Sequence, residues 1–396
     1  MKFTQTLMGL TMLFCVVSCT SDRATDAVEP IIPVHTFSSI NLEEGVSKWL
    51  TTEQQARFPK GELAELDALV STQTLPAAVS RSSAIVRVPA NSNDALARAI
   101  AEAGVGGTVI LEAGDHFESS TVNIQQPVTI RGEEGAVLIS DVQATSQVVI
   151  LEAAIHIQNA YNVVIIGVNF KPSAEVGGTG ILVDNAERTF LVNNTLNDFE
   201  FGIVLEQGDR ARIINNEVNT TSAWTTGFVP FAHGLMIING DDTRVIGNTF
   251  TNSFFGAWTC DESGLYLGNT TTGNFAGNVL CNVPAAAFTM PSGQAVGSAK
   301  PGTNWLTIAN KSFGNSNTGY LIIDGAADNY LSGNEAGSNG AYDFEFTGES
   351  QRFGFPMPTS SGNQAIISSE YTVKDCGVEN TITGGTMIDL VADPCF

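Results

Sequence analysis

The sequence predicts an all-β protein, a single-stranded parallel β-helix of about ten coils, and three observations support this fold class. The first is a pattern that repeats through residues 180–340: a small residue, a short apolar run, a polar turn, a second apolar run and then Asn. Each unit has room for two or three short strands and no helix, which is typical of a solenoid. We assign the repeated asparagine to Asn194, Asn216, Asn248, Asn278, Asn310 and Asn334.

The repeated Asn is the second observation. In a parallel β-helix each strand pairs with its equivalent one coil later, so identical side chains stack about 4.8 Å apart and Asn can build an amide ladder. Asn also tolerates the left-handed backbone of a sharp turn. The third observation is that 43% of the 396 residues are hydrophobic, enough to fill a long core. A β-sandwich is the alternative, but its turns do not return the same residue to the same place.

The repeats resemble those of the pectate-lyase-like superfamily of right-handed parallel β-helices. Residues 94–132 resemble the start of that fold, where a short helix precedes a Gly-Gly-Thr-Val-like strand and an Ala-Gly-x-(Tyr/Phe) turn. The matching residues are Gly106, Gly107, Thr108, Val109, Ala113, Gly114 and Phe117. The resemblance implies a right-handed coil. It does not define the activity, because this scaffold carries lyases, hydrolases, epimerases, adhesins and binding proteins.

Taken in order, residues 1–18 are predicted to be a lipoprotein signal peptide. Lys2 precedes an apolar run, from Leu7 to Val17, that is too short to span a bilayer comfortably. The run ends in Val-Val-Ser-Cys, which resembles the lipobox of bacterial lipoproteins and implies lipidation of Cys19. Thr20, rather than Asp, follows, which by the same resemblance favours the outer membrane. We therefore expect an exported, lipid-anchored protein at the bacterial outer membrane or cell surface. An ordinary secretory signal that contains a cysteine is the alternative.

Residues 19–83 are predicted to form a lipidated tether with a small helical segment at 42–50 and 54–69, and residues 84–396 the β-helix domain. Residues 91–94, Asn-Ser-Asn-Asp, are expected to cap an amphipathic helix that runs to Ala103 and stops at Gly104. This helix would cover the first coil, because an open solenoid end exposes core and unpaired strand edges. The coils are expected to begin at Thr108 and to reach about Leu390.

The cysteines predict an oxidising compartment. Cys15 would leave with the signal peptide and Cys19 would carry lipid, so an even number remains. The four form two plausible disulfide pairs, Cys260 with Cys281 and Cys376 with Cys395, each worth about 3 kcal/mol. No Cys-x-x-Cys motif is present, so the sequence gives no support for a zinc site.

Coil lengths predict two stacked insertions at one corner, at 221–233 and 252–263, and a third insertion at 291–304. Loops on a rigid scaffold commonly carry function, and aromatic faces suit sugar rings. The predicted substrate-binding residues are Trp224, Phe228, Phe255, Trp258, Tyr266 and Lys300. The alternative is that the aromatic loops form a small core of their own. That core would cover an outward apolar column, predicted as Leu182, Val204, Met236, Tyr266 and Phe288.

The polar residues near these loops are the predicted catalytic groups, either for acid/base chemistry or for Ca²⁺: His233, Asp241, Asp242 and Asp261. No metal ligands can be assigned, and Ca²⁺ is the one cofactor considered. The order of His-Gly and Asp-Asp is reversed relative to polygalacturonase-type hydrolases, and the preceding Asn-x-Asp is absent.

A uronate lyase would need an Arg or Lys base and commonly Ca²⁺. The predicted outward positions of the first sheet are acidic or apolar, Asp184 and Glu206 among them. Arg212 and Arg244 occupy equivalent positions on the second sheet and are interpreted as surface residues.

Net charge and isoelectric point limit the partners. A net charge of −23 and a pI near 4.3 argue against nucleic acid and against bare polyanions, unless Ca²⁺ bridges them. We expect a polysaccharide partner and membrane association through the lipid anchor only. The sequence does not define the oligomeric state. Two functions compete: a polysaccharide lyase or hydrolase, and a non-catalytic surface binding, adhesion or structural module. Convergent charged groups in one groove would favour the enzyme, and a dry aromatic core would favour the module.

Overall fold

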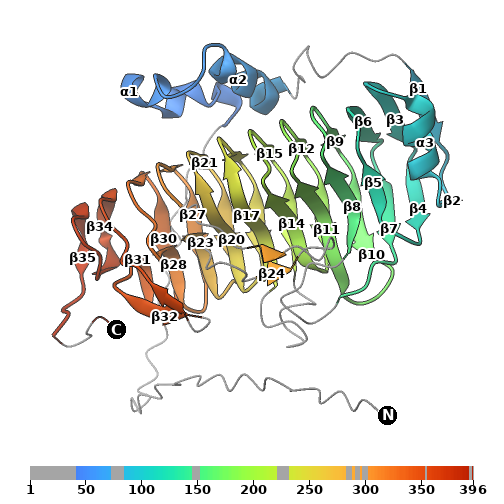
Figure 1. The fold of residues 1–396 in the computed structure, drawn as a ribbon. Coiled ribbons are helices and arrows are strands. Elements are labelled where there is room, and N and C mark those ends of the chain that lie inside the picture. Colours follow the sequence, from blue (N-terminus) through green and yellow to red (C-terminus); the bar gives the residue numbers. More distant parts are fainter. Residues whose placement is uncertain are drawn as a thin grey trace, which may run out of the picture. The chain divides into compact units, whose positions relative to one another are not determined.

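The computed structural model describes residues 42–72, 84–144, 152–220, 232–281, 302–352 and 355–391, together with 288–289, 295–296 and Cys395. It confirms the predicted right-handed parallel β-helix (Figure 1). Each full coil contributes one strand to each of three parallel sheets, which we call X, Z and Y in the order in which the chain passes through them. The predicted tether residue Cys19 and the predicted loop residues Trp224, Phe228 and Lys300 lie outside the described residues.

The strands of sheet X are short and lie on one side of the coil. They are β1 (Ile85–Val88), β3 (Gly107–Leu111), β6 (Val128–Gly132), β9 (Val164–Ile166), β12 (Phe190–Val192), β15 (Arg212–Ile214), β18 (Arg244–Ile246), β21 (Leu265–Leu267), β26 (Leu306–Ile308) and β29 (Tyr330–Ser332). The last two strands, β34 (Gln364–Asp375) and β35 (Thr381–Met387), run through both X and Y.

Sheets Z and Y complete the coil. Sheet Z contains β2 (Ser92–Asn93), β4 (Gly114–Glu118), β7 (Ala136–Ser140), β10 (Asn169–Pro172), β13 (Thr195–Asn197), β16 (Glu217–Asn219), β19 (Thr249–Thr251), β22 (Thr270–Thr272), β27 (Lys311–Phe313) and β30 (Glu335–Gly337). Sheet Y contains β5 (Val122–Ile124), β8 (Ala153–Gln158), β11 (Gly177–Asp184), β14 (Phe199–Glu206), β17 (His233–Asp241), β20 (Phe255–Glu262), β23 (Ala276–Leu280), β28 (Thr318–Ile322) and β31 (Tyr342–Phe346). Two antiparallel hairpins stand apart, β24 (Phe288–Thr289) with β25 (Ala295–Val296) and β32 (Ser350–Arg352) with β33 (Phe355–Met357).

The predicted amide ladder is present at the corner between sheets X and Z. Its buried members are Asn194, Asn216, Asn248, Asn269, Asn310 and Asn334. The side-chain oxygen of Asn248 accepts from the backbone N–H of Asn216 at 2.8 Å and from its side-chain Nδ2 at 3.0 Å. In the coil after Asn248, the ladder member is Asn269, whose side-chain oxygen accepts from Asn248. The assignment of Asn278 was wrong. Asn278 belongs to β23, where its Nδ2 donates to Thr271.

The same error misplaced one insertion. The glycine that pairs with Gly234 on the next coil is Gly256, not Gly264, so residues 255–262 form β20 rather than a loop. Of the two stacked insertions that were predicted, the one at 252–263 is thus a regular strand of sheet Y. The other, at 221–233, lies mostly outside the described residues.

Helix α3 (Leu96–Ala103) covers the first coil, as predicted, and buries Leu96, Ala99, Ile100 and Ala103 in the interior core. It ends at Gly104, whose φ of 68° only glycine adopts at little cost. The predicted cap is wrong, because the Asp94 carboxylate accepts instead from the Ser119 N–H at 2.7 Å. A neighbouring strand supplies the acceptor: the Glu118 carboxylate receives the Ala95 and Leu96 N–H groups at 3.1 and 2.9 Å.

The segment 42–72 packs on the outer face of sheet X (Figure 1). It contains two 3₁₀ turns, Leu42–Glu44 and Ser47–Trp49, and the helices α1 (Thr52–Gln55) and α2 (Glu62–Thr72). No helix among the described residues is long and apolar enough to cross a membrane. The segment 42–72 buries the apolar side chains of Val46, Leu50, Leu66, Leu69 and Val70. They share one cluster with the outward residues of sheet X from Val164 to Ile308. We call this segment the strap.

A buried ion triad lies under the strap. Arg212 and Arg244 are in register on adjacent strands and are only 5% and 3% exposed, so the interpretation of both as surface residues was wrong. The Glu62 carboxylate of α2 accepts from Arg212 Nη2 at 2.6 Å and from Arg244 Nε at 3.0 Å. Burial lowers the Arg212 pKa to about 10, even though the carboxylate of Glu62 opposes the shift. The strap is therefore fixed to sheet X by charge as well as by apolar contact.

Candidate functional site on the outer face of sheet Y

The predicted aromatic residues of β17 and β20 form a buried cluster. His233 is 2% exposed, and its ring lies 5.6 Å from that of Phe201, 5.3 Å from that of Phe255 and 5.1 Å from that of Trp258. Phe255 and Trp258 are buried as well. For the described residues, this burial is what the alternative of a small aromatic core predicts.

The predicted acidic residues lie at the far end of the same strands. His233 begins β17 and Asp241 ends it, so eight residue steps of about 3.3 Å place them about 26 Å apart. Asp242 pairs with Arg244 at 3.0 Å. Asp261 is fully buried at the corner between Y and X, where its carboxylate accepts from Thr243 Oγ1 at 3.1 Å and its carbonyl from Trp305 Nε1 at 2.9 Å. The structure does not bring His233 together with these acids.

Tyr266 lies inside the coil, in the interior core, with its hydroxyl 2.8 Å from Thr259 Oγ1. Burial raises its pKa well above the ordinary value. The predicted outward column therefore needs two corrections, because Tyr266 belongs to sheet X and Phe288 to the hairpin strand β24. The column observed on the outer face of sheet Y is Leu182, Val204, Met236, Trp258, Val279 and Leu321.

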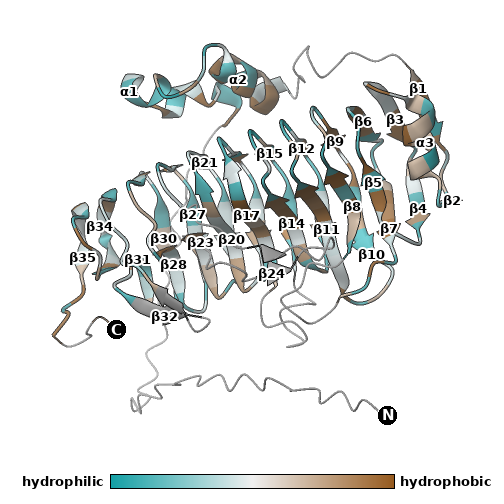
Figure 2. Cartoon of the chain, in the orientation of Figure 1, coloured by the Kyte–Doolittle hydropathy of each residue, from teal (hydrophilic) through white to brown (hydrophobic). Residues whose placement is uncertain are grey.

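Both predicted disulfides are present. Cys260 on β20 is joined to Cys281, the residue that follows β23, with 4.9 Å between their Cα atoms, and Cys376 is joined to Cys395 with 5.6 Å. The first bridge lies within the outer apolar cluster of sheet Y. In Figure 2 the strongest brown, which marks hydrophobic residues, lies on strands in the N-terminal half of the coil, and many of the turns between strands are teal.

A polar group lies beside the apolar column, where the strands of sheet Y end. Gln158, Asp184 and Glu206 are in register on β8, β11 and β14. The Asp184 carboxylate accepts from Gln158 Nε2 at 2.9 Å and lies 3.2 Å from His156 Nε2. The hydrogen bond with His156 lowers the Asp184 pKa, although partial burial opposes the shift. We call His156, Gln158, Asp184 and Glu206 the polar group.

The environment of Glu206 shifts the pKa of its carboxyl group in the opposite direction. It is 7% exposed, and its Oε1 accepts from Asn239 Nδ2 at 3.2 Å. Its Oε2 is buried and has no hydrogen-bond partner among the described residues. Burial raises the Glu206 pKa to about 7, the hydrogen bond from Asn239 opposes the shift, and the nearby charge of Asp184 adds to it. Near neutral pH, Asp184 is therefore ionised while much of Glu206 carries a proton.

Two carboxyl groups whose environments move their pKa values apart are the usual pattern of an acid and a base that act together. Asp184 can accept a proton or stabilise positive charge, and Glu206 can donate a proton. His156 and Gln158 hold the Asp184 carboxylate in place. The structural alternative is that Glu206 is only a buried acid held by Asn239. The unpartnered oxygen favours a site, because a buried polar atom without a hydrogen-bond partner costs about 1–3 kcal/mol.

The sequence indicated part of this group. Asp184 and Glu206 were recognised as outward acidic positions, but His156 was not singled out. A signal was available in Ala-Ala-Ile-His-Ile-Gln, residues 153–158, where His and Gln alternate with apolar residues. Alternation puts His156 and Gln158 on one face of a strand, but only the register with β11 places them beside Asp184.

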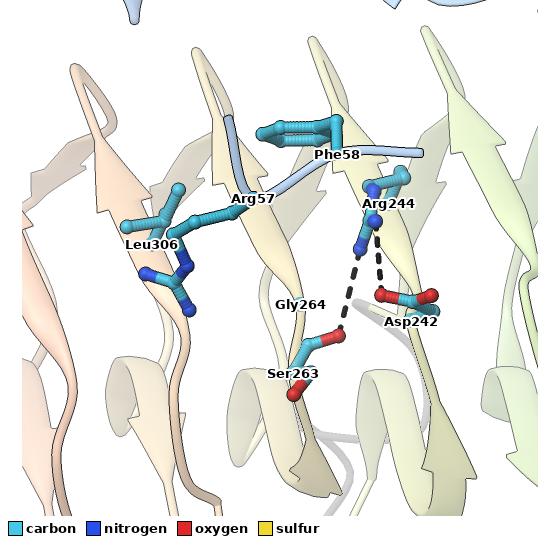
Figure 3. A pocket seen from close by; sticks show the side chains of 7 residues that line it. All are labelled: Arg57, Phe58, Asp242, Arg244, Ser263, Gly264 and Leu306. Carbon is cyan, nitrogen blue, oxygen red and sulfur yellow. Dashed lines mark hydrogen bonds and ion pairs between the residues drawn. The ribbon is translucent and has the colours of Figure 1, made fainter. Parts of the chain in front are cut away.

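A cavity lies between the strap and sheet X. Its volume is about 100 Å³, and it is lined by Arg57, Phe58, Asp242, Arg244, Ser263, Gly264 and Leu306 (Figure 3). Arg244 has acceptors for all five of its N–H groups, because Glu62 accepts twice and Asp242, Thr243 and Ser263 accept once each. The cavity therefore belongs to the joint between strap and coil, and we assign it no ligand. No group of three or more His, Cys, Asp or Glu side chains in the described part of the chain is arranged to hold a metal ion.

Fold and site together define a parallel β-helix protein with a polar group on the outer face of one sheet. Residues 153–336 match the family model described as "Right handed beta helix region". Among solved structures, the chain is similar to the A-module of the Azotobacter vinelandii mannuronan C-5 epimerase AlgE4. The identity is 14% and the TM-score 0.49, over 75% of this chain and 92% of that one.

Two further solved structures are similar to the chain at lower scores. The PL6 family alginate lyase AlyGC is 15% identical with a TM-score of 0.40, over 85% of this chain and 45% of that one. The Streptococcus pneumoniae surface adhesin PfbA is 10% identical with a TM-score of 0.36, over 75% and 89%. No curated protein matches the sequence. At these identities the likeness concerns the fold alone.

Proposed function

We propose that this chain is an exported, lipid-anchored β-helix protein that processes polysaccharide, with Asp184 and Glu206 as its ionisable pair. The observation that carries the proposal is their placement. The two carboxyl groups are in register on adjacent strands, and their pKa values are moved in opposite directions. Glu206 acts as the proton donor to a leaving sugar oxygen, and Asp184 acts on the other side of the bond as base or nucleophile.

The charges favour a hydrolase over a uronate lyase. A lyase needs a basic side chain near the substrate and a group that neutralises the uronate carboxylate. The described outward residues of sheet Y from β5 to β17 include His156, Asp184 and Glu206 but no Lys or Arg. His233, Asp241, Asp242 and Asp261 were predicted as one catalytic set. Their positions on opposite ends of β17 and β20 move the proposal to the polar group.

The test is a screen of the soluble form of the chain, from Thr20 onward and without the lipid anchor, against neutral and uronic polysaccharides with and without Ca²⁺. Both new reducing ends and absorbance from unsaturated products are followed, so that hydrolysis and elimination are told apart. On any substrate that is cleaved, Asp184→Asn and Glu206→Gln are expected to lose at least about 10²-fold in turnover. Glu217→Gln is the matched control, because Glu217 is exposed on strand β16 of sheet Z, in the coil that follows Glu206. Undiminished turnover in Glu206→Gln would refute the assignment.

Lipid anchoring is tested separately. We propose that residues 1–18 are removed and that Cys19 carries the lipid, so that membrane contact runs through the anchor alone. Cys19→Ala is expected to move the protein from the membrane fraction to the soluble fraction and to abolish labelling with a fatty-acid probe. Unchanged fractionation would leave an ordinary secretory signal as the correct interpretation.

One observation favours a second function, a non-catalytic surface binding or adhesion module. The aromatic side chains around His233 are buried against one another rather than presented to a ligand. A folded protein that cleaves no member of the panel would support this alternative.

A further inference from the structure

Carboxamide side chains border the polar group. The first row lies at the turn from sheet Y to sheet X, where Asn159, Asn185, Gln207 and Asn239 occupy equivalent positions on successive coils. Their φ angles are 51°, 48°, 54° and 60°. Asn159, Asn185 and Gln207 are exposed, and Asn239 donates to Glu206. Asn185 Nδ2 donates to Asn159 Oδ1 at 2.6 Å.

A second row continues toward the N-terminal end of sheet Y. Exposed Gln125, which follows β5, donates to Gln158 Oε1 at 3.4 Å. Gln158 in turn donates to the Asp184 carboxylate at 2.9 Å. We call the two rows together the carboxamide array: Gln125, Gln158, Asn159, Asn185, Gln207 and Asn239.

Turn geometry accounts for only part of this array. Asn is favoured at left-handed turn positions for backbone reasons alone. Gln lacks the short side chain that makes Asn favourable at a left-handed turn. Gln207, with its φ of 54°, therefore carries backbone strain, which commonly marks functional positions. Gln125 and Gln158 do not have positive φ at all. The carboxamide chemistry is thus shared by positions with different backbone requirements, and all of them surround the acid pair.

The array fits a neutral, hydroxyl-rich ligand. Each carboxamide both donates and accepts, so it can pair with sugar hydroxyl groups of either sense. Successive coils repeat it at about 4.8 Å, and the four steps from β5 to β17 span about 19 Å along the helix axis. The charge of Asp184 would repel uronate carboxylates at close range, in a chain whose net charge is −23.

We infer that the carboxamide array binds a neutral polysaccharide chain running parallel to the helix axis across β5, β8, β11, β14 and β17. The inference rests on the proposed function, because the array is placed to deliver this chain to Asp184 and Glu206. It adds the substrate class and the residues that recognise it.

The experiment is affinity electrophoresis of the full chain in gels that contain one soluble polysaccharide each. The neutral probes are mixed-linkage β-glucan, galactomannan, arabinoxylan and dextran, and the uronic probes are polygalacturonate and alginate. Glu206→Gln is run alongside wild type, so that binding is measured without cleavage. We expect retardation by at least one neutral probe, weaker or no retardation by the uronic probes, and about tenfold weaker binding in Asn185→Ala and in Gln125→Ala.

Asn91→Ala is the matched control. Asn91 is also exposed and also has a positive φ, 60°, but it lies at a turn near the first coil, outside the array. Stronger binding of a uronic probe, equal loss in Asn91→Ala, or no binding of any neutral probe would overturn the inference. The proposed function fails differently: a neutral chain that binds through the array but is never cleaved leaves this inference standing and removes the catalytic role of Glu206.

Discussion

Replacing Glu62 with alanine is the sharpest test of how the strap is held. In the native protein one carboxylate lies between two buried guanidinium groups, at 2.6 Å from Arg212 and 3.0 Å from Arg244. Glu62→Ala leaves both cations under an apolar lid with less compensation. Breaking a buried pair in this way costs about 3–5 kcal/mol, more than the pair itself contributes. We expect the free energy of unfolding to fall by that amount, or the strap to detach.

The assay combines urea unfolding with hydrogen exchange of the α2 amides. Glu65→Ala on the same helix is the control, because the Glu65–Arg188 pair is longer, 3.6 Å, and partly exposed, so its loss should cost less than about 1 kcal/mol. A triple variant, Glu62→Leu with Arg212→Met and Arg244→Met, should recover most of the loss, since apolar groups can replace a buried ion triad. Equal effects of Glu62→Ala and Glu65→Ala would refute the argument.

Three further changes have defined outcomes. Because the folded-state pKa of Glu206 is raised from 4.5 to about 7, stability from its protonated form is present below pH 4.5 and is lost as pH rises through 7. Glu206→Gln should remove this pH dependence and gain up to about 3 kcal/mol above pH 7, measured by urea titrations at several pH values; an unchanged pH profile would contradict it. Asn248→Ala should cost about 3 kcal/mol in the same assay, because it leaves the buried N–H of Asn216 without its acceptor and removes one acceptor of the Asn216 Nδ2; a loss below 1 kcal/mol would contradict that. Gly264→Ala should destabilise by about 1–3 kcal/mol, because an added Cβ meets the Trp305 ring, and Trp305→Leu should relieve that clash.

The fold was predictable because its determinants are local and repeated. One missed register shows the limit of that signal. Residues 268–278 contain Gly-Asn three times, and periodicity alone cannot say which Asn enters the ladder. Strand pairing decides it: Leu265 pairs with Arg244, so Asn269 rather than Asn278 follows Asn248. The insertion assigned to 252–263 came from the same slip.

The candidate site was less predictable, for a different reason. The outward acidity of Asp184 and Glu206 follows from alternation along single strands, but their pKa values depend on which side chains the neighbouring coils bring to them. The environment of His233 could not be predicted from the sequence either, because its burial depends on Phe201 and Trp258 from the coils on either side. The role of Glu62 had no local signal at all, because its partners lie 150 and 182 residues further along the chain.

The long sequence separation within the ion triad has a consequence for the order of folding. Coils that contact only their neighbours can form one after another as the chain becomes available. The strap precedes all of them in sequence, yet its binding surface is complete only when β9 through β26 have formed. Loop-closure entropy delays such distant contacts, so the strap should dock late, and mutations in it should mainly speed unfolding rather than slow folding. A docked strap thus reports that the middle coils of the solenoid have assembled in the correct register.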